Sequence, residues 1–155
     1  MMNFRFCLMN QLEAEEIANI WKYDDVYSFY DMTADMEDYL SFIDAKERGN
    51  KFFSCYQNDQ LVAWYSIEIL DANKIELGLG MKPEHTGKGF GVDFINGAMD
   101  HIASKFCTKE FILSVASFNQ RAIKVYEKVG FTKIGVFMQN TNGGDYEFIK
   151  MSLWK

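Results

Sequence analysis

Residues 74–129 alternate between strand and helix patterns, and this alternation constrains the fold more than any other feature of the chain. Apolar residues alternate in two short segments and recur at helical spacing in two others. The segments are a strand, a helix, a strand and a helix, over 74–82, about 90–104, 109–116 and 119–129. A strand–helix–strand unit places its two strands parallel in one sheet through a right-handed crossover. We therefore expect a partly parallel central sheet with helices packed against it.

The segments on either side extend this pattern. Strands are predicted over 3–9, 51–57, 61–70, 131–139 and 145–154, and helices over 10–23 and 33–48. The first helix begins with a predicted capping box, formed by Asn10 and Glu13. Asn58-Asp59 and Asn142-Gly143-Gly144 are turn sequences that predict two hairpins. The order β α α β β β α β α β β describes one α/β domain over 1–155 with a mixed central sheet.

Length and composition exclude several other classes of protein. The 155 residues are 48% apolar and 25% charged, which suffices for a buried core and excludes a disordered chain. No apolar run approaches the roughly 18 residues of a membrane-spanning helix, and the first ten residues lack the apolar stretch of a signal peptide. Three scattered cysteines, Cys7, Cys55 and Cys107, are typical of reduced thiols and predict a cytoplasmic protein.

The charge is unevenly distributed along the chain. The net charge of −6 argues against a nucleic-acid partner, because phosphate contacts need an excess of Lys and Arg. Residues 13–47 hold 11 acidic and two basic residues, a local charge of −9, and the remainder holds 11 acidic and 14 basic residues, a local charge of +3. The two regions either face different ligands or reflect a solvated acidic helix pair. His85 and His101 lack partners at metal-ligand spacing, so no metal is expected.

A glycine-rich turn, residues 87–91 (GKGFG), separates a predicted strand from a predicted helix. Glycine allows successive backbone N–H groups to converge on an anion, and the helix N-terminus adds partial positive charge. The turn is therefore either a phosphate cradle or a flexible connection. A dinucleotide fingerprint, G-x-G-x-x-G, needs glycine as its sixth residue. It is excluded because the sixth residue is Val92 when counted from Gly87 and Phe94 when counted from Gly89. A P-loop is excluded because Gly89 follows Lys88 where Ser or Thr is needed.

Two motifs together resemble the GCN5-related N-acetyltransferase (GNAT) family. Residues 81–91 (MKPEHTGKGFG) are similar to its acyl-CoA pyrophosphate loop. Residues 119–131 (NQRAIKVYEKVGF) are similar to its second signature, N-x-x-A-x-x-x-Y-x-x-x-G-F. The motifs occur in the family's order, and the predicted strand–helix order fits nearly the whole chain. One departure from the family pattern is Thr86, where the family usually has Gln or Arg. A direct side-chain contact to the pyrophosphate would therefore be shorter or absent, with Lys88 as a substitute.

The resemblance implies a set of cofactor-binding residues. Backbone groups of the strand end would hold the acetyl and pantetheine amides, the turn's N–H groups would hold the pyrophosphate, and Asn119 would contact the pantetheine arm or the adjoining loop. The residues so assigned are Leu79, Gly80, Met81, Thr86, Gly87, Lys88, Gly89, Phe90, Gly91, Val92, Asn119 and Tyr126. A basic cluster near this site suits a ligand with several phosphates. It consists of Lys82, Lys88, Arg121, Lys124 and Lys128.

The resemblance also implies the catalytic groups. Tyr126 matches the family's general acid, since a phenol keeps its proton at pH 7 and can donate it to a thiolate. The alternative for Tyr126 is ordinary core packing. Glu76, on the strand entering the turn, is the favoured base. Glu68 on the neighbouring strand and a water chain without a dedicated base remain alternatives.

The acceptor side is expected in the first helical region, where the family usually places it. Tyr27, Phe29, Tyr30 and Asp31 are the predicted substrate-binding residues, because aromatic walls and carboxylates suit a cationic amine. The alternative for these residues is core packing with a solvated acidic face.

The resulting hypothesis is an acetyl-CoA-dependent N-acetyltransferase that acts on a primary amine, a small molecule, by direct attack in a ternary complex. Acetyl-CoA is the expected co-substrate, with no metal, no nucleic acid and no membrane as partners. The exposed edges of a mixed sheet make a homodimer reasonable. The alternatives are a protein or peptide N-acetyltransferase and a non-catalytic acyl-CoA sensor.

Overall fold

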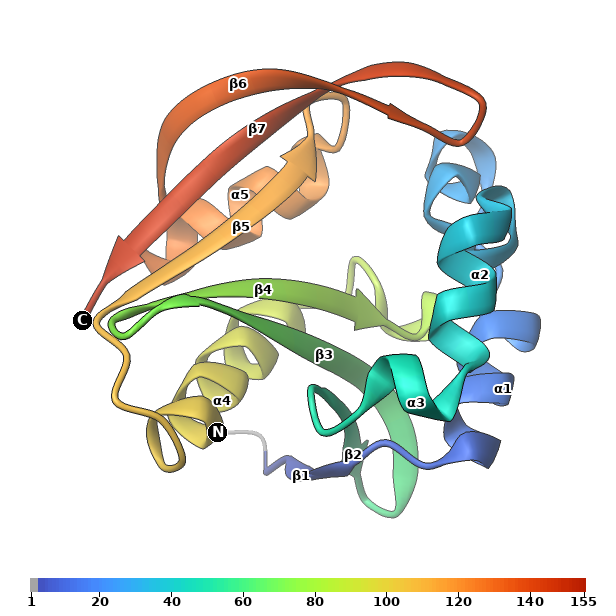
Figure 1. Ribbon diagram of the computed structural model, residues 1–155, viewed down its shortest axis with the longest axis horizontal. Helices are drawn as coiled ribbons and strands as arrows, with labels where there is room; N and C mark the ends of the chain where they lie inside the picture. The colour runs from blue at the N-terminus through green and yellow to red at the C-terminus, as the bar shows by residue number, and fades with distance from the viewer. Residues whose placement is uncertain (1–2) are drawn as a thin grey trace.

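A single seven-stranded mixed sheet forms the centre of the molecule, as expected from the sequence (Figure 1). The computed structural model describes residues 3–155; Met1 and Met2, the first residues of the predicted domain, lie outside this range. The strand order is β1-β2-β3-β4-β5-β7-β6. The strands are β1 (Arg5–Leu8), β2 (Phe52–Gln57), β3 (Gln60–Asp71), β4 (Lys74–Met81), β5 (Glu110–Ala116), β6 (Thr132–Thr141) and β7 (Gly144–Trp154).

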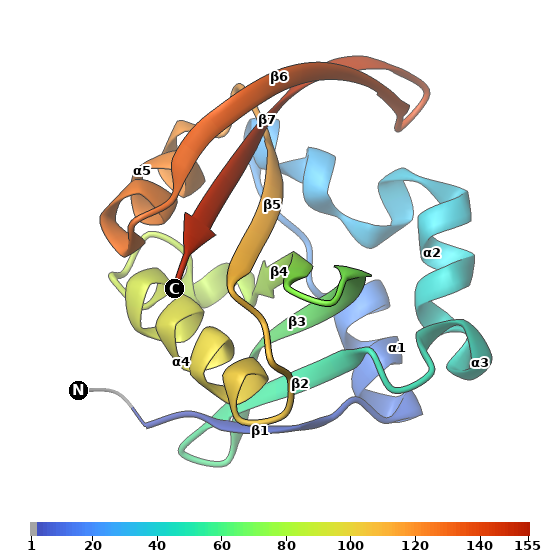
Figure 2. The ribbon, with the colours of Figure 1, turned by 60° about the vertical axis from the view of Figure 1, so that its left-hand side comes forward.

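The helices cover both faces of this sheet (Figures 1 and 2). The α-helices are α1 (Gln11–Ile20), α2 (Met36–Ile43), α3 (Ala45–Arg48), α4 (Gly91–Ala103) and α5 (Gln120–Val129). Helices α4 and α5 pack on one face around Tyr65, Met99 and Phe111, and α1 and α2 pack on the other around Trp21 and Phe42. None of the helices within 3–155 is both long and apolar enough to cross a lipid bilayer.

Local sequence signals explain the two hairpins and the first helix. Asn58 and Asp59 have φ angles of 50° and 62°, and Asn142 and Gly143 have 52° and 77°. Two consecutive positive φ angles are the requirement of a type I′ turn, whose twist matches that of the paired strands. At α1, the side chain of Asn10 accepts from the backbone N–H of Glu13, which returns a hydrogen bond to the backbone N–H of Asn10.

The region between α1 and β2 differs from the sequence-based expectation of one helix over 33–48. It contains two short 3₁₀ helices, η1 (Asp25–Tyr30) and η2 (Met32–Ala34), followed by α2 and α3. Asp35 and Asp44 each adopt an extended backbone and cap the helix that follows. Because an aspartate that caps a helix leaves the helical conformation itself, the apolar periodicity continues while the helix is interrupted twice.

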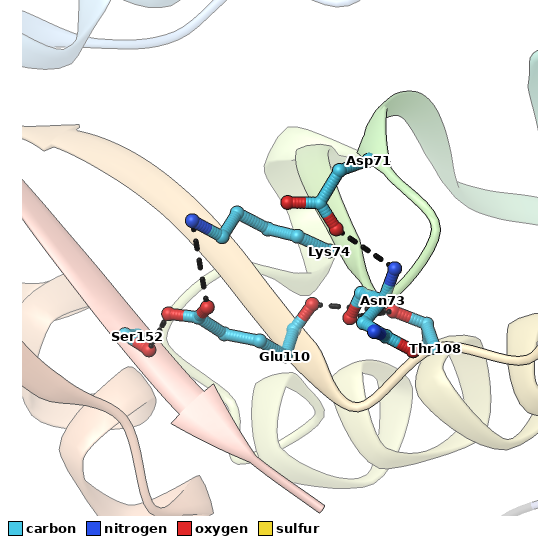
Figure 3. A network of polar contacts seen from close by, with 6 residues as sticks. All are labelled: Asp71, Asn73, Lys74, Thr108, Glu110 and Ser152. Atoms are coloured by element: carbon cyan, nitrogen blue, oxygen red, sulfur yellow. Dashed lines mark hydrogen bonds and ion pairs between the residues drawn. The ribbon is translucent and has the colours of Figure 1, made fainter.

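The sheet splits between its two parallel central strands. Strands β4 and β5 pair only over Lys74–Glu76 and Glu110–Ile112, after which they diverge (Figure 1). The closed end is fastened by Glu110, whose carboxylate accepts from Ser152 Oγ at 2.6 Å and lies 3.7 Å from Lys74 Nζ (Figure 3). The carbonyl of Asn73 accepts hydrogen bonds from the backbone of Lys109 and Glu110 at 2.8 and 2.9 Å. This network holds the strands together at one end and leaves the other end open.

On the face covered by α4, His101 lies in an aromatic cluster. Its ring stacks on Phe6 with centroids 5.1 Å apart, and its Nδ1 lies 2.5 Å from the hydroxyl of Tyr65. Burial, and to a smaller extent the charge of Lys105, lowers the pKa of His101. The folded protein therefore resists protonation at a ring that the unfolded chain would protonate near pH 6.5.

We expect the free energy of unfolding to fall as the pH decreases through this range. Above pH 6.5 neither state binds the proton, and below it the unfolded chain binds more protons than the folded protein. Urea unfolding between pH 7.5 and about 5.5 should show this decline, which His101→Gln should reduce and His85→Gln should leave in place. Equal slopes for wild type and H101Q would contradict the assignment.

Candidate active site

A cavity of about 740 Å³ opens where β4 and β5 part. Its walls come from the end of β4, the loop before α4, helix α5, the η1–α2 segment (residues 25–43) and the tip of the β6–β7 hairpin. Arg121 and Lys128 enter it from α5, whereas Asp31, Asp35 and Asp38 enter it from the η1–α2 segment. The cavity therefore offers cations and carboxylates from different walls, which suits a ligand pair of opposite charge.

Most of the site residues predicted from the sequence lie in this one cavity. Those lining it are Tyr27, Phe29, Tyr30, Asp31, Leu79, Gly80, Met81, Thr86, Gly87, Gly89, Gly91, Val92, Asn119 and Tyr126. Three predicted residues, Glu76, Lys88 and Phe90, do not line it. Two motifs about thirty residues apart in the sequence are thus brought to one site by the packing of α4 against α5.

The loop needs glycine at three positions, two because of their backbone conformation and one because a side chain would not fit. Gly87 and Gly89 have φ angles of +74° and +82°, in the left-handed region that other residues rarely adopt. Gly91 begins α4, and a Cβ there would lie 2.9 Å from Val125 Cγ1, so its glycine allows α4 to approach α5. No side chain caps the first turn of α4. The loop and this turn therefore present backbone N–H groups suited to an anion.

The side chains of the loop have other roles than those expected. Thr86 Oγ1 donates to the carbonyl of Pro83 at 2.7 Å, which closes the short 3₁₀ helix η3 (Pro83–His85). Phe90 packs edge-on against His85, with ring centroids 5.2 Å apart. Lys88 is exposed and points no group into the cavity. The position of Lys88 therefore does not support the expectation that its side chain contacts the pyrophosphate in place of Thr86.

The end of β4 supplies backbone groups beside the loop. Leu79, Gly80 and Met81 pair with β3 on one side, and the other side faces the gap left by β5. The carbonyl of Met81 accepts a hydrogen bond from the hydroxyl of Tyr23 at 2.6 Å. This free strand edge can pair with an amide-containing ligand in the manner of an added strand.

Tyr126 lies on α5 and lines the cavity. Burial strongly raises the pKa of its phenol, and the neighbouring Tyr30 raises it further. The phenol is therefore neutral at physiological pH and carries a proton that it can donate. Its ring packs edge-on against Phe131 at 6.1 Å between centroids. Nearby Asn119 uses its side-chain oxygen to cap α5, accepting from the N–H of Ala122 at 3.1 Å.

The β6–β7 hairpin closes the acidic and aromatic side of the cavity, a contribution that the sequence interpretation missed. Its tip reaches the η1–α2 segment, as Figure 1 shows. Asn142 donates from its backbone N–H to Asp35 Oδ2 at 3.0 Å and from its side chain to the carbonyl of Phe29 at 2.7 Å. Phe29 packs against Tyr146 at 4.8 Å between centroids. These partners are more than 100 residues apart, so no local pattern marks them.

Glu76 lies where β4 still pairs with β5, opposite Ile112, and therefore before the cavity opens. It faces Glu68 across β3 and β4, and both carboxylates line a separate hollow of about 320 Å³. Ser66 and Gly78 line both this hollow and the large cavity. A carboxylate in this position reaches the large cavity only through an intermediary such as water.

Solved structures of other proteins share the fold of this chain. The acetyltransferase (GNAT family) from Bacillus anthracis superimposes with a TM-score of 0.76 at 16% identity, over 99% of this chain and 96% of that one. Spermidine N-acetyltransferase from Vibrio cholerae, in complex with CoA and spermine, gives 0.72 at 19% identity, over 97% and 95% of the chains. At these identities the likeness shows a shared fold.

The sequence itself establishes the family. The model of the Acetyltransferase (GNAT) family matches residues 13–131, and the chain belongs to this family of acetyltransferases. A curated relative, spermidine N(1)-acetyltransferase of Vibrio cholerae, is 32% identical over 89 residues, which are 54% of this chain. The match spans about half, 51%, of that relative's length. The resemblance to this family drawn from the two motifs is confirmed.

Proposed function

We propose that the protein transfers the acetyl group of acetyl-CoA to a primary amine of a small molecule, by direct attack within a ternary complex. The observation that carries the proposal is the single cavity at the split of β4 and β5, shared by the glycine loop, the free edge of β4, Tyr126 and the acidic–aromatic wall. Both reactants can then be held beside the same proton donor, which removes much of the entropic cost of bringing them together.

The residues present fit an acyl-CoA ligand. Two left-handed glycines, an uncapped helix start and a cation on α5 suit a pyrophosphate, and the unpaired edge of β4 suits the amides of the pantetheine arm. The backbone N–H groups of Gly87, Gly89, Gly91 and Val92, which line the cavity, would hold the pyrophosphate, and backbone groups of Leu79, Gly80 and Met81 would hold the pantetheine amides. Acetyl-CoA supplies an acetyl group activated as a thioester.

Tyr126 is the proposed general acid. Its buried phenol would keep the proton on Oη and donate it to the departing sulfur. Backbone N–H groups at the end of β4 would stabilise negative charge that develops on the carbonyl oxygen.

The proposed base must reach the amine from outside the large cavity. Glu76 would take the proton through water beside Ser66 and Gly78, whereas the alternative is a water chain with no dedicated carboxylate. The pH dependence of turnover in wild type, E76Q and E68Q distinguishes these routes. Turnover falls at acidic pH when the base is protonated, so only removal of the carboxylate that acts as the base should change this part of the profile.

A cationic amine suits the acceptor side. Asp31 and Asp38 line the cavity together with the rings of Tyr27, Phe29 and Tyr30, and such walls bind an ammonium group by charge and by cation–π contact. Relatives named for spermidine make this amine the first probe to use. The closure of this side by the β6–β7 hairpin favours a small molecule over a peptide.

A thermal-shift titration tests the proposal first. At 100 times its Kd, acetyl-CoA should add about 2.7 kcal/mol to the free energy of unfolding, which corresponds to about 5–10 °C in Tm for a chain of this size. NADH and ATP serve as controls. The absence of a shift at millimolar acetyl-CoA would refute the enzyme and the sensor together.

Thiol release then separates the remaining alternatives. With acetyl-CoA saturating, we expect free thiol to appear with spermidine and not with a lysine-containing peptide. Faster release with the peptide would favour the peptide acetyltransferase, and binding without release for any amine tested would favour the acyl-CoA sensor.

We also propose a cytoplasmic location and a homodimer. Strand β6 is an edge of the sheet, and Ile134, Val136 and Met138 are exposed on it at alternating positions. Such an edge is suited to pairing with a second copy, which sedimentation of the purified chain would detect.

A further inference from the structure

We propose that Arg121 binds the pyrophosphate of the cofactor in place of the missing Thr86 contact, and that its cation–π contact with Tyr27 couples cofactor binding to the acceptor wall. This inference rests on the proposed function. It adds a binding and positioning residue that neither motif marks, because position 121 is one of the variable positions of the second signature.

Arg121 is placed to reach the glycine loop. It lies in the first turn of α5, and its Nη1 is 3.9 Å from the point that a Cβ on Gly87 would occupy. The ion pairs found within residues 3–155 are Lys74–Glu110 and Lys82–Glu84, so Arg121 has no carboxylate partner there. A guanidinium beside a backbone anion cradle, without a counter-ion of its own, is suited to a phosphate oxygen.

The other candidate cations are less well placed. Lys82 is paired with Glu84 at 3.8 Å, and neither Lys88 nor Lys124 lines the cavity. Lys128 does line it, but it lies seven residues further along α5, roughly 10 Å from position 121 at 1.5 Å per residue. Arg121 is therefore the basic side chain that both lines the cavity and lies beside Gly87 of the loop, where Thr86 makes no outward contact.

The same guanidinium also contacts the acceptor side. Its Cζ lies 4.0 Å from the centroid of the Tyr27 ring, in the geometry of a cation–π contact. A ring contact of this kind uses no hydrogen-bond acceptor, so the guanidinium N–H groups that point away from the ring stay available to an anion. Arg121 can therefore hold Tyr27 and an oxyanion at the same time, and fixing one of them restricts the other.

Tyr27 belongs to helix η1, which the rest of the protein holds through Phe29 and Tyr30: Phe29 packs against Tyr146, and the Tyr30 hydroxyl accepts from the N–H of Ala116 at 3.3 Å. The ring of Tyr27 itself contacts Arg121. Helix η1 buries none of its six residues. It is flanked by Tyr23, which donates to Asp31 Oδ1 from its backbone at 2.8 Å and to the Met81 carbonyl from its hydroxyl. An additional fixed contact at Tyr27 would order the wall that also carries Phe29 and Tyr30. Cofactor binding would then favour amine binding through Arg121.

Ligand truncation tests the first part. We would measure Kd by calorimetry for acetyl-CoA, for 3′-dephospho-CoA, which keeps the pyrophosphate, and for S-acetylpantetheine, which lacks it. Arg121→Ala should weaken the first two by about 10- to 100-fold, the range of one charge-assisted contact, and leave the third within about threefold. Lys133→Ala, which removes the charge of an exposed lysine on β6 outside the cavity, should change none of them.

Three results would overturn this assignment. Equal weakening of all three ligands would show a merely structural role for Arg121. A loss confined to acetyl-CoA would place the contact at the 3′-phosphate, and no loss would remove the contact. Failure of the wild type to bind acetyl-CoA would instead refute the proposed function, and the two failures are therefore distinguishable.

Hydrogen exchange of the backbone amides of residues 25–30 tests the coupling. Saturating acetyl-CoA should slow exchange in the wild type and in Tyr27→Phe, which keeps the ring. It should not do so in Arg121→Ala or Tyr27→Leu, even when each is saturated. Full protection in saturated R121A would show that η1 is ordered by other contacts, and the coupling would be wrong.

Discussion

Replacement of Tyr126 by Phe is expected to lower kcat by about 10²- to 10⁴-fold, the range for loss of a general acid, and to leave the Kd of acetyl-CoA nearly unchanged. The ring keeps its edge-on packing against Phe131, and only the hydroxyl is lost. Burial raises the pKa of this phenol, so that the proton is present throughout the working range. A departing thiolate would then have to take its proton from water.

Stopped-flow or steady-state thiol release with spermidine, together with calorimetry for acetyl-CoA, measures both quantities. Tyr39→Phe is the matched control, because its hydroxyl is hydrogen-bonded to Asn19 outside the cavity, and it should leave kcat unchanged. An unchanged kcat in Y126F would remove Tyr126 from the mechanism. A large loss of acetyl-CoA affinity would instead assign it to binding.

Gly80→Ala should destabilise the protein by about 3 kcal/mol, at the upper end of the usual cost of overpacking. A Cβ at position 80 would lie 2.0 Å from Trp64 Nε1 and 2.5 Å from its Cε2, so the indole must move. Phe42 and Phe52 lie at 5.2 and 6.0 Å between ring centroids from Trp64 and limit this movement. Trp64 and Gly80 both line the cavity, and ligand affinity should fall with stability.

Thermal and urea unfolding measure this effect, which corresponds to about 6–12 °C in Tm for a chain of this length. Gly135→Ala is the matched control, because a Cβ on this strand glycine would meet no atom within 4 Å beyond its chain neighbours, and its φ is not positive. In a Trp64→Leu background, Gly80→Ala should cost less than it does in the wild type, since the smaller side chain removes the clash. Equal stabilities of G80A and G135A would show that the indole yields without cost.

Local sequence signals are sufficient for the hairpins, for the start of α1 and for the element order. Each depends on neighbours in the chain: Asn142 and Gly143 tolerate positive φ, and Asn10 with Glu13 satisfies the first N–H groups of a helix. The same reasoning is wrong over 33–48. The apolar periodicity there predicts one continuous helix, whereas in the folded chain Asp35 and Asp44 cap two separate helices. The capping signal is nevertheless present in the sequence.

By itself, the sequence determined the family, the order of strands and helices, and the two motifs that meet at the cavity. Only the tertiary structure decided where β4 and β5 part, which leaves Glu76 outside the cavity, and which cation, Arg121 instead of Lys88, faces the glycine loop. It also decided that Asn142 closes the wall at Asp35. Backbone preferences and motif spacing act over a few residues, whereas these contacts join residues 30 to more than 100 positions apart, and their geometry follows from how the sheet twists and the helices pack.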